Sequence, residues 1–389
     1  MRTSPLSDAA PPASLEAQVL LCCAQSCHNP ASTHQLSSLL RQGLDWTSLI
    51  QLAERHRVLP LVYRALQAVN SDTVPQPIRA ELYHDFHANA QRNLFLAGTL
   101  LKLLRLLENH QIPAISYKGP VLAMLAYGNL TLRQFGDLDI LVHKKDVARA
   151  QDLLLSQGYR WWEQRPLTFF PRQRKVYELF NEEGQVLVEL HWAVTSSTFY
   201  FPLDPVALWQ SLETVVLLDK PVHTLSREHL LLILCAHGAK HHWDRLAWIC
   251  DIAMLLHVCA DINWQHLLEH AERLGSRRML LLGIFLAYTL LGTSLPDNLQ
   301  QRLRSDPAIP GLAAEVQARL FTNASQPLSA IDRPLFYLRL RDRLRHRLRC
   351  SGYLMYHMMT SRLLKRFARG SMSSSYSANS KFAASSRDS

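Results

Sequence analysis

The sequence has few charged residues and no long hydrophobic run. Only 19% of its 389 residues are charged and 48% are hydrophobic, which indicates a globular protein with a well-buried core. The longest apolar run, residues 279–291, is shorter than the ~20 residues that a membrane-spanning helix needs. The N-terminus lacks the basic and apolar regions of a secretion signal. We therefore expect a cytoplasmic protein without a membrane span.

Several familiar motifs are missing as well. The seven cysteines include no CxxC pair and mostly fall in apolar, helix-like segments, which is typical of thiols that fill a core in a reducing compartment. No GxxxxGK[ST] loop, GxGxxG turn or GxSxG elbow occurs. P-loop chemistry, a dinucleotide-binding fold and an α/β-hydrolase site are therefore not supported.

The charge that is present is mainly basic. Lysine and arginine outnumber aspartate and glutamate by 42 to 32, which gives a net charge of +10 and a pI near 9.4. Such a balance favours polyanionic partners, namely nucleotides, nucleic acid or anionic lipid surfaces. Charge alone does not choose among these three.

Hydrophobic periodicity divides the chain into five regions. The pattern in the second region includes a long helix from about Arg79 to Asn109, and strand-like and helix-like segments alternate in the third. We expect an α+β fold in which a small mixed sheet is flanked by N- and C-terminal helical regions. The regions are a disordered leader (1–14), a helical region (15–111), an α/β core (112–201), a second helical region (202–349), and a basic segment with a disordered Ser-rich tail (350–389).

Within the α/β core, two aspartates share one predicted strand. Residues two apart in a strand project from the same face, so Asp137 and Asp139 place two carboxylates side by side. Two like charges held this close repel, and a divalent cation between them relieves the repulsion. Taken alone, a D-x-D pattern is common and usually carries no function.

A third acid follows about fifty residues later. Glu189 lies in the apolar strand-like run 186–192, where an unpaired buried carboxylate is costly. If this run lies beside the strand of Asp137, Glu189 completes a three-carboxylate metal site for Mg²⁺ or Mn²⁺. The alternative is that Glu189 pairs with an arginine or faces solvent.

These residues belong to a longer pattern. The run ISYKGPVLAMLAYGNLTLRQFGDLDILVHKKDVARAQDLLLSQGYR, followed by VLVELHW and HGAKHHWDRLAWICDIAML, closely resembles a family of uncharacterised bacterial nucleotidyltransferases with a minimal polymerase-β-type core. The resemblance extends from about Trp46 to near residue 349 and includes the stretch ERHRVLPLVYRAL. It implies a nucleotidyltransferase core in region 112–201.

Position by position, the resemblance implies metal coordination and catalysis by Asp137, Asp139 and Glu189. Lys118 and Gly119 mark the end of the first strand near the triphosphate, where the wider superfamily has a Gly-Ser pair, so that a lysine charge replaces the usual serine contact. Arg133, four residues before Asp137, is a candidate for bidentate phosphate binding, although an arginine in a loop is structurally neutral about as often.

One helical face of the C-terminal region is polar almost throughout. We expect a single helix over residues 235–253, whose polar face lines a cleft against the α/β core rather than facing bulk solvent. Lys240 is then a candidate for nucleotide binding, and His237, His241 and Asp251 are candidates for the acceptor site. His191, in the strand-like run 186–192, is a further candidate for the acceptor site. The face comprises His237, Lys240, His241, Asp244, Arg245, Trp248 and Asp251, opposite Cys235, Ala239, Trp243, Leu246, Cys250 and Ala253.

A zinc hydrolase is a weaker interpretation of the same face. His237 and His241 have the i, i+4 spacing of a metal pair, but no glutamate follows His237 and no third ligand is indicated. Among 18 histidines some such pairs arise by chance.

The segment around residues 339–370 is strongly basic, with Leu340, Leu344, Leu348 and Leu354 between the arginines. We interpret it first as a solvated helix packed on the body of the protein. The alternatives are peripheral contact with an anionic lipid surface or with nucleic acid, and nucleic acid is the weaker because no aromatic stacking pattern accompanies the basic residues.

The leading functional hypothesis is transfer of a nucleoside monophosphate from an NTP to an unknown acceptor, such as a small molecule, glycan or protein, with release of pyrophosphate. The alternative is a catalytically silent nucleotide-binding or adaptor protein on the same fold. Retention of all three acids favours the enzyme.

Overall fold

The structure is a computed structural model, and it describes residues 14–29, 32–69, 72–161, 175–194, 201–259, 261–321, 332–352 and 355. The expected tail and all but the last residue of the expected leader therefore lie outside the described residues. The described part is an α+β fold in which a small mixed sheet is flanked by helices, as the sequence predicts.

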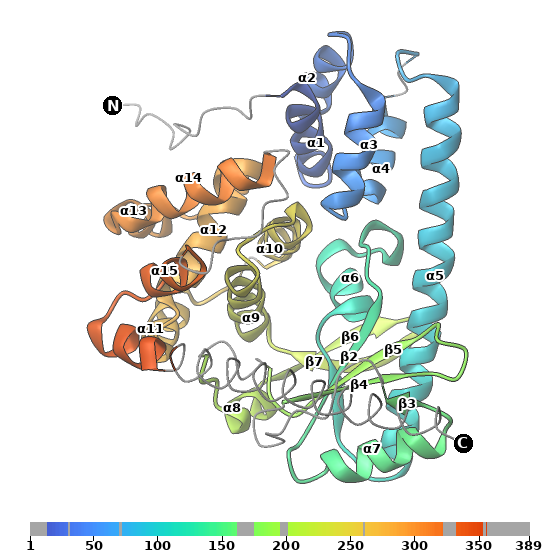
Figure 1. Ribbon diagram of the computed structural model, residues 1–389, viewed down its shortest axis with the longest axis vertical. Helices are drawn as coiled ribbons and strands as arrows, with labels where there is room; N and C mark the ends of the chain where they lie inside the picture. The colour runs from blue at the N-terminus through green and yellow to red at the C-terminus, as the bar shows by residue number, and fades with distance from the viewer. Residues whose placement is uncertain are drawn as a thin grey trace, which may run out of the picture.

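Five helices form the described part of the N-terminal region. Polar caps begin two of them, because the side chains of Ser14 and Asp45 accept hydrogen bonds from the backbone N–H groups of Ala17 and Ser48. The last helix, α5, runs from the N-terminal helices down the side of the molecule to the sheet, which links these two parts directly (Figure 1). The helices are α1 (Leu15–Gln25), α2 (Ser32–Leu39), α3 (Trp46–Arg55), α4 (Leu59–Val69) and α5 (Gln76–Asn109).

Over the described residues, the main sheet has five strands in the order β1-β2-β5-β4-β3, and β2 and β5 are its parallel pair. Helix α6 (Gly119–Tyr127) and a 3-10 turn, η1 (Leu130–Leu132), connect β1 to β2, and α7 (Val147–Ser156) follows β2. The strands are β1 (Ala114–Ser116), β2 (Asp137–Val142), β3 (Arg160–Trp161), β4 (Val176–Phe180) and β5 (Leu187–His191).

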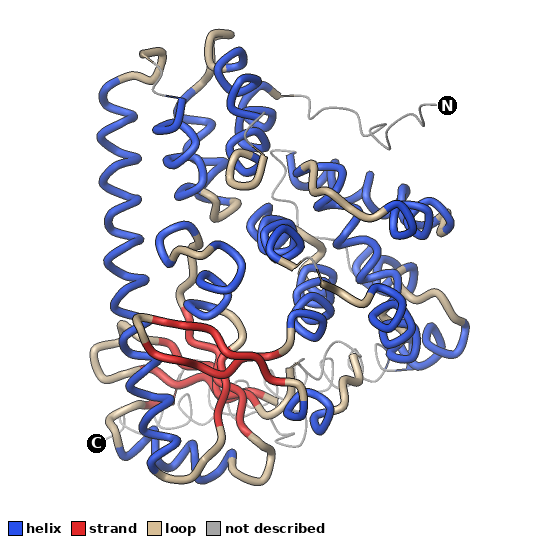
Figure 2. Tube along the Cα trace, turned by 180° about the vertical axis from the view of Figure 1, so that it is seen from behind, coloured by secondary structure: helices blue, strands red, loops and turns tan. Residues whose placement is uncertain are grey.

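Alternation along the strands gives the sheet two different faces. Leu138 and Ile140 of β2 and Val188 of β5 are buried in a cluster with apolar residues of α5 and α7. Asp137 and Asp139, at the alternate positions of β2, face the other way. Seen from behind in Figure 2, the strands form one patch with helices on either side. The polar face of the sheet is thus left for the C-terminal region to cover.

The C-terminal region is mostly helical, and α12 is buried along almost its whole length. None of the described helices is both long and apolar enough to cross a membrane. All seven cysteines are described, and none forms a disulfide. The helices are α8 (Pro205–Gln210), α9 (Arg227–Lys240), α10 (Leu246–Val258), α11 (Trp264–Leu274), α12 (Arg277–Leu291), α13 (Asp297–Ser305), α14 (Ala308–Phe321) and α15 (Asp332–Arg339).

The structure corrects the expectation that region 202–349 is helical throughout. Strands β6 (Leu212–Leu217) and β7 (Lys220–Leu225) form an antiparallel hairpin within it. The two turn residues, Leu218 and Asp219, both have positive φ, as a type I′ turn requires, but they lack the Asn-Gly or Asp-Gly signature that would reveal such a turn in a sequence. The hairpin contributes Val215, Leu217 and Val222 to the buried cluster of the sheet.

The single helix expected over residues 235–253 is also wrong. Helix α9 ends at Lys240, α10 begins at Leu246, and His242 and Trp243 between them have positive φ. The Trp243 N–H donates to the carbonyl of Gly238 at 2.9 Å, which closes the end of α9 and turns the indole inward. A Cβ atom at Gly238 would lie 2.3 Å from the Trp243 ring, so packing of this tryptophan fixes the break.

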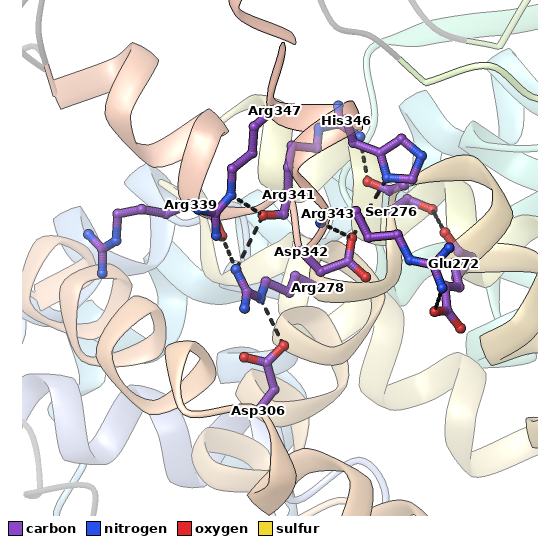
Figure 3. Close-up of polar contacts among 12 residues, drawn as sticks. Glu272, Ser276, Arg278, Asp306, Arg339, Arg341, Asp342, Arg343, His346 and Arg347 are labelled. Atoms are coloured by element: carbon purple, nitrogen blue, oxygen red, sulfur yellow. Dashed lines mark hydrogen bonds and ion pairs between the residues drawn. The ribbon is translucent and has the colours of Figure 1, made fainter. Parts of the chain in front are cut away.

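The basic segment after α15 is anchored by arginine contacts to backbone carbonyls (Figure 3). Arg341 is fully buried and donates to the Gly275 carbonyl at 2.7 Å, while Arg278 pairs with Asp306 and donates to the carbonyls of Arg339 and Arg341. Its leucines are divided: Leu340 is buried, whereas Leu344 and Leu348 are 70% and 64% exposed, and Leu354 lies outside the described residues. The described part of the segment is therefore packed on the body and leaves two leucines on the surface.

Candidate active site

Four acids of the described residues lie on the polar face of the sheet. Asp139 of β2 and Glu189 of β5 are direct partners in the parallel register, and Asp137 lies one pleat away from Asp139 on the same face. Glu178 of β4 is in turn the partner of Glu189, so a row of three carboxylates crosses β2, β5 and β4. The predicted adjacency of the two acid-bearing strands is confirmed, and the sequence reasoning missed Glu178.

Two cationic groups approach the most buried of these acids. The Lys118 Nζ atom and the His191 Nε2 atom each lie 3.1 Å from the same oxygen, Oδ1 of Asp139, and Asp139 is only 2% exposed. His191 Nε2 is also 3.1 Å from Glu189 Oε2. The protonated imidazole can therefore donate to either carboxylate.

Electrostatics separates the two aspartates. Burial alone would raise the pKa of Asp139, but the Lys118 ammonium and the His191 ring hold that pKa below its usual range. Burial, reinforced by the carboxylates of Asp139 and Glu189, raises the pKa of Asp137. The carboxylates around Asp137 thus repel its negative charge, and a cation at this site would reduce that repulsion.

The loop between β1 and α6 brings its backbone close to the acids. Gly119 has a φ of +52°, and a Cβ atom at this position would lie 3.2 Å from the carbonyl oxygen of Asp137. Glycine is therefore needed both for the left-handed backbone and for the close approach of this loop to β2. Lys118 stands at the N-cap of α6, where the free N–H groups and the helix dipole favour an anion.

The acids line a cavity of about 630 Å³ between the sheet and the C-terminal helices. The whole polar face predicted for residues 237–251 lines this cavity, whereas the residues predicted to lie opposite are buried. The prediction that this face lines a cleft against the α/β core is thus confirmed, although α9 and α10 share the face between them. Lys240 and the two histidines His237 and His241 face the acids from the opposite wall.

Burial and positive neighbours lower the pKa values of the two histidines and of Lys240 on this helical wall. Burial and then the nearby Lys118 ammonium lower the pKa of both His237 and Lys240, and burial followed by Lys240 lowers the pKa of His241 to about 4. Both imidazoles are therefore neutral at neutral pH and can accept hydrogen bonds. Their rings contact each other and Trp248, with centroid separations of 4.7 to 5.3 Å.

The structure pairs two candidate site residues with each other. Arg133 donates from Nε and Nη2 to the two carboxylate oxygens of Asp251 at 2.8 and 3.0 Å, and the Tyr127 hydroxyl donates to Asp251 at 2.9 Å. Both Arg133 and Asp251 line the cavity, but the fork of the guanidinium is already engaged. This arrangement favours a role in joining α10 to the loop before β2.

Sequence comparison places these residues in a known family. A family model described as uncharacterised nucleotidyltransferase matches residues 42–292. This chain is a member of that family. The matched segment contains all the acids, lysines and histidines of the cavity that are described above. No curated protein matches this chain.

Among solved structures, an antigenic nucleotidyltransferase-like protein from Paracoccidioides brasiliensis is similar to this family member at 16% sequence identity. The match covers 54% of this chain and 96% of the other chain, with a TM-score of 0.31. A similarity of this size supports no conclusion about the site.

The donor set of this family member fits a divalent cation. Ligand atoms of Asp139, Glu189 and His191 lie within 4.8 Å of one another, and Asp137 adds a further carboxylate at the edge. Two or three carboxylates suit Mg²⁺ or Mn²⁺, and the imidazole nitrogen suits Mn²⁺ better than Mg²⁺. His191, which the sequence suggested for the acceptor site, therefore belongs to the acidic cluster.

Proposed function

We propose that this protein transfers a nucleoside monophosphate from an NTP to an acceptor hydroxyl or phosphate, with release of pyrophosphate. The observation that carries the proposal is the convergence of Asp137, Asp139 and Glu189 on one face of β2 and β5, at the floor of a cavity whose opposite wall carries Lys240. Membership of the nucleotidyltransferase family supports the reaction class. A polymerase-β-type ancestry of the core is part of this proposal.

The site residues divide the task between them. Lys118 and the N-terminus of α6 attract the triphosphate, and Lys240 adds a point charge from the helical wall. In the transfer, the acceptor oxygen bonds to the α-phosphorus, the bond from that phosphorus to pyrophosphate breaks, and Glu189 takes the proton of an attacking hydroxyl. Alignment of the two substrates and neutralisation of phosphate charge provide most of the expected rate gain.

Asp137, Asp139 and Glu189 would hold the divalent cation, and His191 lies close enough to join them. When bound, Mg²⁺ or Mn²⁺ supplies charge neutralisation of the phosphates and polarises the reacting phosphorus. In its absence, Lys118 and His191 neutralise part of the acidic cluster. Binding of the cation is therefore expected to compete with the contact of Lys118 to Asp139.

The proposal is tested with Asp137→Asn and Asp139→Asn. Each variant is expected to lose Mn²⁺-dependent NTP binding, because each loses a hard anionic ligand, and to keep the fold. Binding is measured by titrating NTP with and without Mn²⁺, and folding by circular dichroism. Exposed Asp72, which does not line the cavity, supplies the control variant Asp72→Asn. Unchanged Mn²⁺-dependent binding in both site variants would contradict the assignment.

Transfer is tested separately from binding. Wild-type protein is incubated with each NTP labelled at the α-phosphate, Mn²⁺ and a cell extract, and label is expected to move to an acceptor together with release of pyrophosphate. The rival function is a nucleotide-binding or adaptor protein that performs no catalysis. Tight Mn²⁺-dependent binding without any transfer of label would favour that rival.

A further inference from the structure

Two arginines that line the cavity, Arg57 and Arg245, take no part in the ion pairs of the site. Arg57 follows α3, and Arg245 precedes α10, and both line the cavity that contains the acids. Within the described residues, neither guanidinium forms an ion pair with a carboxylate, in contrast to Arg133, which is held by Asp251. Asp137 and Asp244, which line the same cavity, attract Arg57 and Arg245 without forming an ion pair with them.

A buried histidine fixes these two arginines beside each other. His56, fully buried, accepts a hydrogen bond at Nδ1 from the Leu246 N–H at 3.1 Å, and its carbonyl accepts one from the Ala247 N–H at 3.2 Å. His56 directly precedes Arg57, and Leu246 directly follows Arg245. The contact thus ties the end of α3 to the start of α10 and brings two like charges into one part of the wall.

Their proximity is unfavourable without a ligand. Burial and then the charge of Arg245 lower the pKa of Arg57, so the two guanidinium groups repel each other. The guanidinium of Arg245 also lies 5.6 Å from the centre of the Trp248 ring, which limits its freedom to move away.

The backbone at Arg57 adds a second cost. Arg57 has a φ of +55° and stands just after α3, where the N–H of Val58 donates to the carbonyl of Ala53 at 2.9 Å. Helices usually have glycine at this position, and α11 has Gly275 and α12 has Gly292 there. An arginine at this position of α3 is held in a less favourable conformation, and its side chain reaches the cavity.

We propose that Arg57 and Arg245 form an oxyanion subsite that binds a phosphate group of a substrate. The inference rests on the proposed nucleotidyl transfer and adds to it a second anion site in the same cavity, formed by residues other than Lys240 and the acids that would hold the cation. The phosphate belongs either to the triphosphate tail of the NTP or to a phosphorylated acceptor. Two guanidinium groups that face one ligand suit a phosphate because each can donate two parallel hydrogen bonds.

The first experiment measures binding of inorganic phosphate in EDTA, without nucleotide, by isothermal titration calorimetry. Wild type is expected to bind phosphate saturably, and Arg57→Met with Arg245→Met to weaken binding by about tenfold or more. The control is Arg92→Met, an exposed arginine of α5 that does not line the cavity. Absence of saturable binding in wild type, or equal binding in the double variant, would overturn the proposal.

A backbone variant separates the proposed role from a structural one. Arg57→Gly removes the guanidinium and relieves the left-handed backbone, so we expect it to lose phosphate binding while the melting temperature stays equal or rises by a few degrees. A large fall in melting temperature would instead identify Arg57 as a structural residue and would overturn its role in binding.

A second titration identifies which substrate carries the phosphate that binds here. Phosphate is titrated into wild type loaded with Mn²⁺ and an NTP analogue that cannot be cleaved between its α- and β-phosphates. Loss of phosphate binding assigns the subsite to the triphosphate tail, and retained binding assigns it to a phosphorylated acceptor. Asp139→Asn distinguishes this inference from the proposed function, because it should lose Mn²⁺-dependent NTP binding and keep metal-free phosphate binding.

Discussion

At the scale of single residues, the site is defined by how much charge is buried and what stands next to it. Asp139 is almost wholly buried, yet it is compatible with folding because Lys118 and His191 both contact one of its oxygens. Removing one partner from such a pair leaves a buried charge without compensation, which costs far more than the pair contributes when intact. The proposed metal site and the stability of the core are therefore coupled through Lys118.

Lys118→Met tests this coupling. In EDTA the variant is expected to lose up to about 3–5 kcal/mol of unfolding free energy, because the buried carboxylate of Asp139 keeps only its contact with His191. Addition of Mn²⁺ should restore much of that loss, since a cation can replace the missing ammonium. Chemical denaturation with and without Mn²⁺ measures both effects, and equal destabilisation in the two conditions would show that no cation binds at Asp139.

At the scale of elements, the turn between α9 and α10 decides where the polar wall of the cavity lies. Trp243 is fully buried, and Cβ atoms placed at Gly238 and Gly283 would come within 3 Å of its ring. The indole therefore requires glycine on two neighbouring helices. Because it sits in the turn, its packing also sets the direction in which Lys240 and Arg245 project.

Trp243→Ala and Lys240→Met are expected to separate packing from function. Trp243→Ala should cost about 3–5 kcal/mol of unfolding free energy because it leaves a cavity between α9 and α12. Lys240→Met should weaken NTP binding and hardly change thermal stability, since the side chain borders the cavity and Met keeps its length. Thermal unfolding and NTP titration of both variants provide the comparison. A large loss of stability in Lys240→Met would contradict its assignment to substrate binding.

At the scale of the whole molecule, the N-terminal and C-terminal regions meet at His56. Its Nδ1 atom accepts from the Leu246 N–H, so its Nε2–H is the donor to the carbonyl of Leu320, 3.1 Å away on α14. One neutral imidazole thus joins α3, α10 and α14. Burial, and then the charge of Arg55, lower the pKa of His56 to about 4.

This lowered pKa predicts acid sensitivity. His56 binds a proton near pH 6.5 in the unfolded chain and only near pH 4 in the folded protein, so its contribution to stability is present above pH 6.5 and is lost as the pH falls through this window. The loss amounts to at most about 3 kcal/mol. His56→Gln should show a shallower fall in unfolding free energy between pH 6.5 and 4, and an identical slope would contradict the prediction.

How much of this could be predicted depends on the range of the interactions involved. The acids Asp137, Asp139 and Glu189 could be found because two-residue alternation in a strand is local and because a family pattern surrounds them. The polar face of residues 237–251 was predicted with its members in the right place, although the helix was predicted without its break. The break depends on Trp243 packing against both Gly238 and Gly283, and no local pattern reports the contact with Gly283, which is distant in the chain.

The sequence by itself determined most of the helical segments and the shared face of Asp137 and Asp139, because these follow from periodicity and residue type. The resemblance to a family suggested the reaction class. Only the tertiary structure decided which charges neutralise each other. It joined Arg133 to Asp251, Lys118 and His191 to Asp139, and Arg57 to the neighbourhood of Arg245 through His56. Each of these arrangements brings together groups that are distant in the chain, and their pairing depends on the packing of several elements at once.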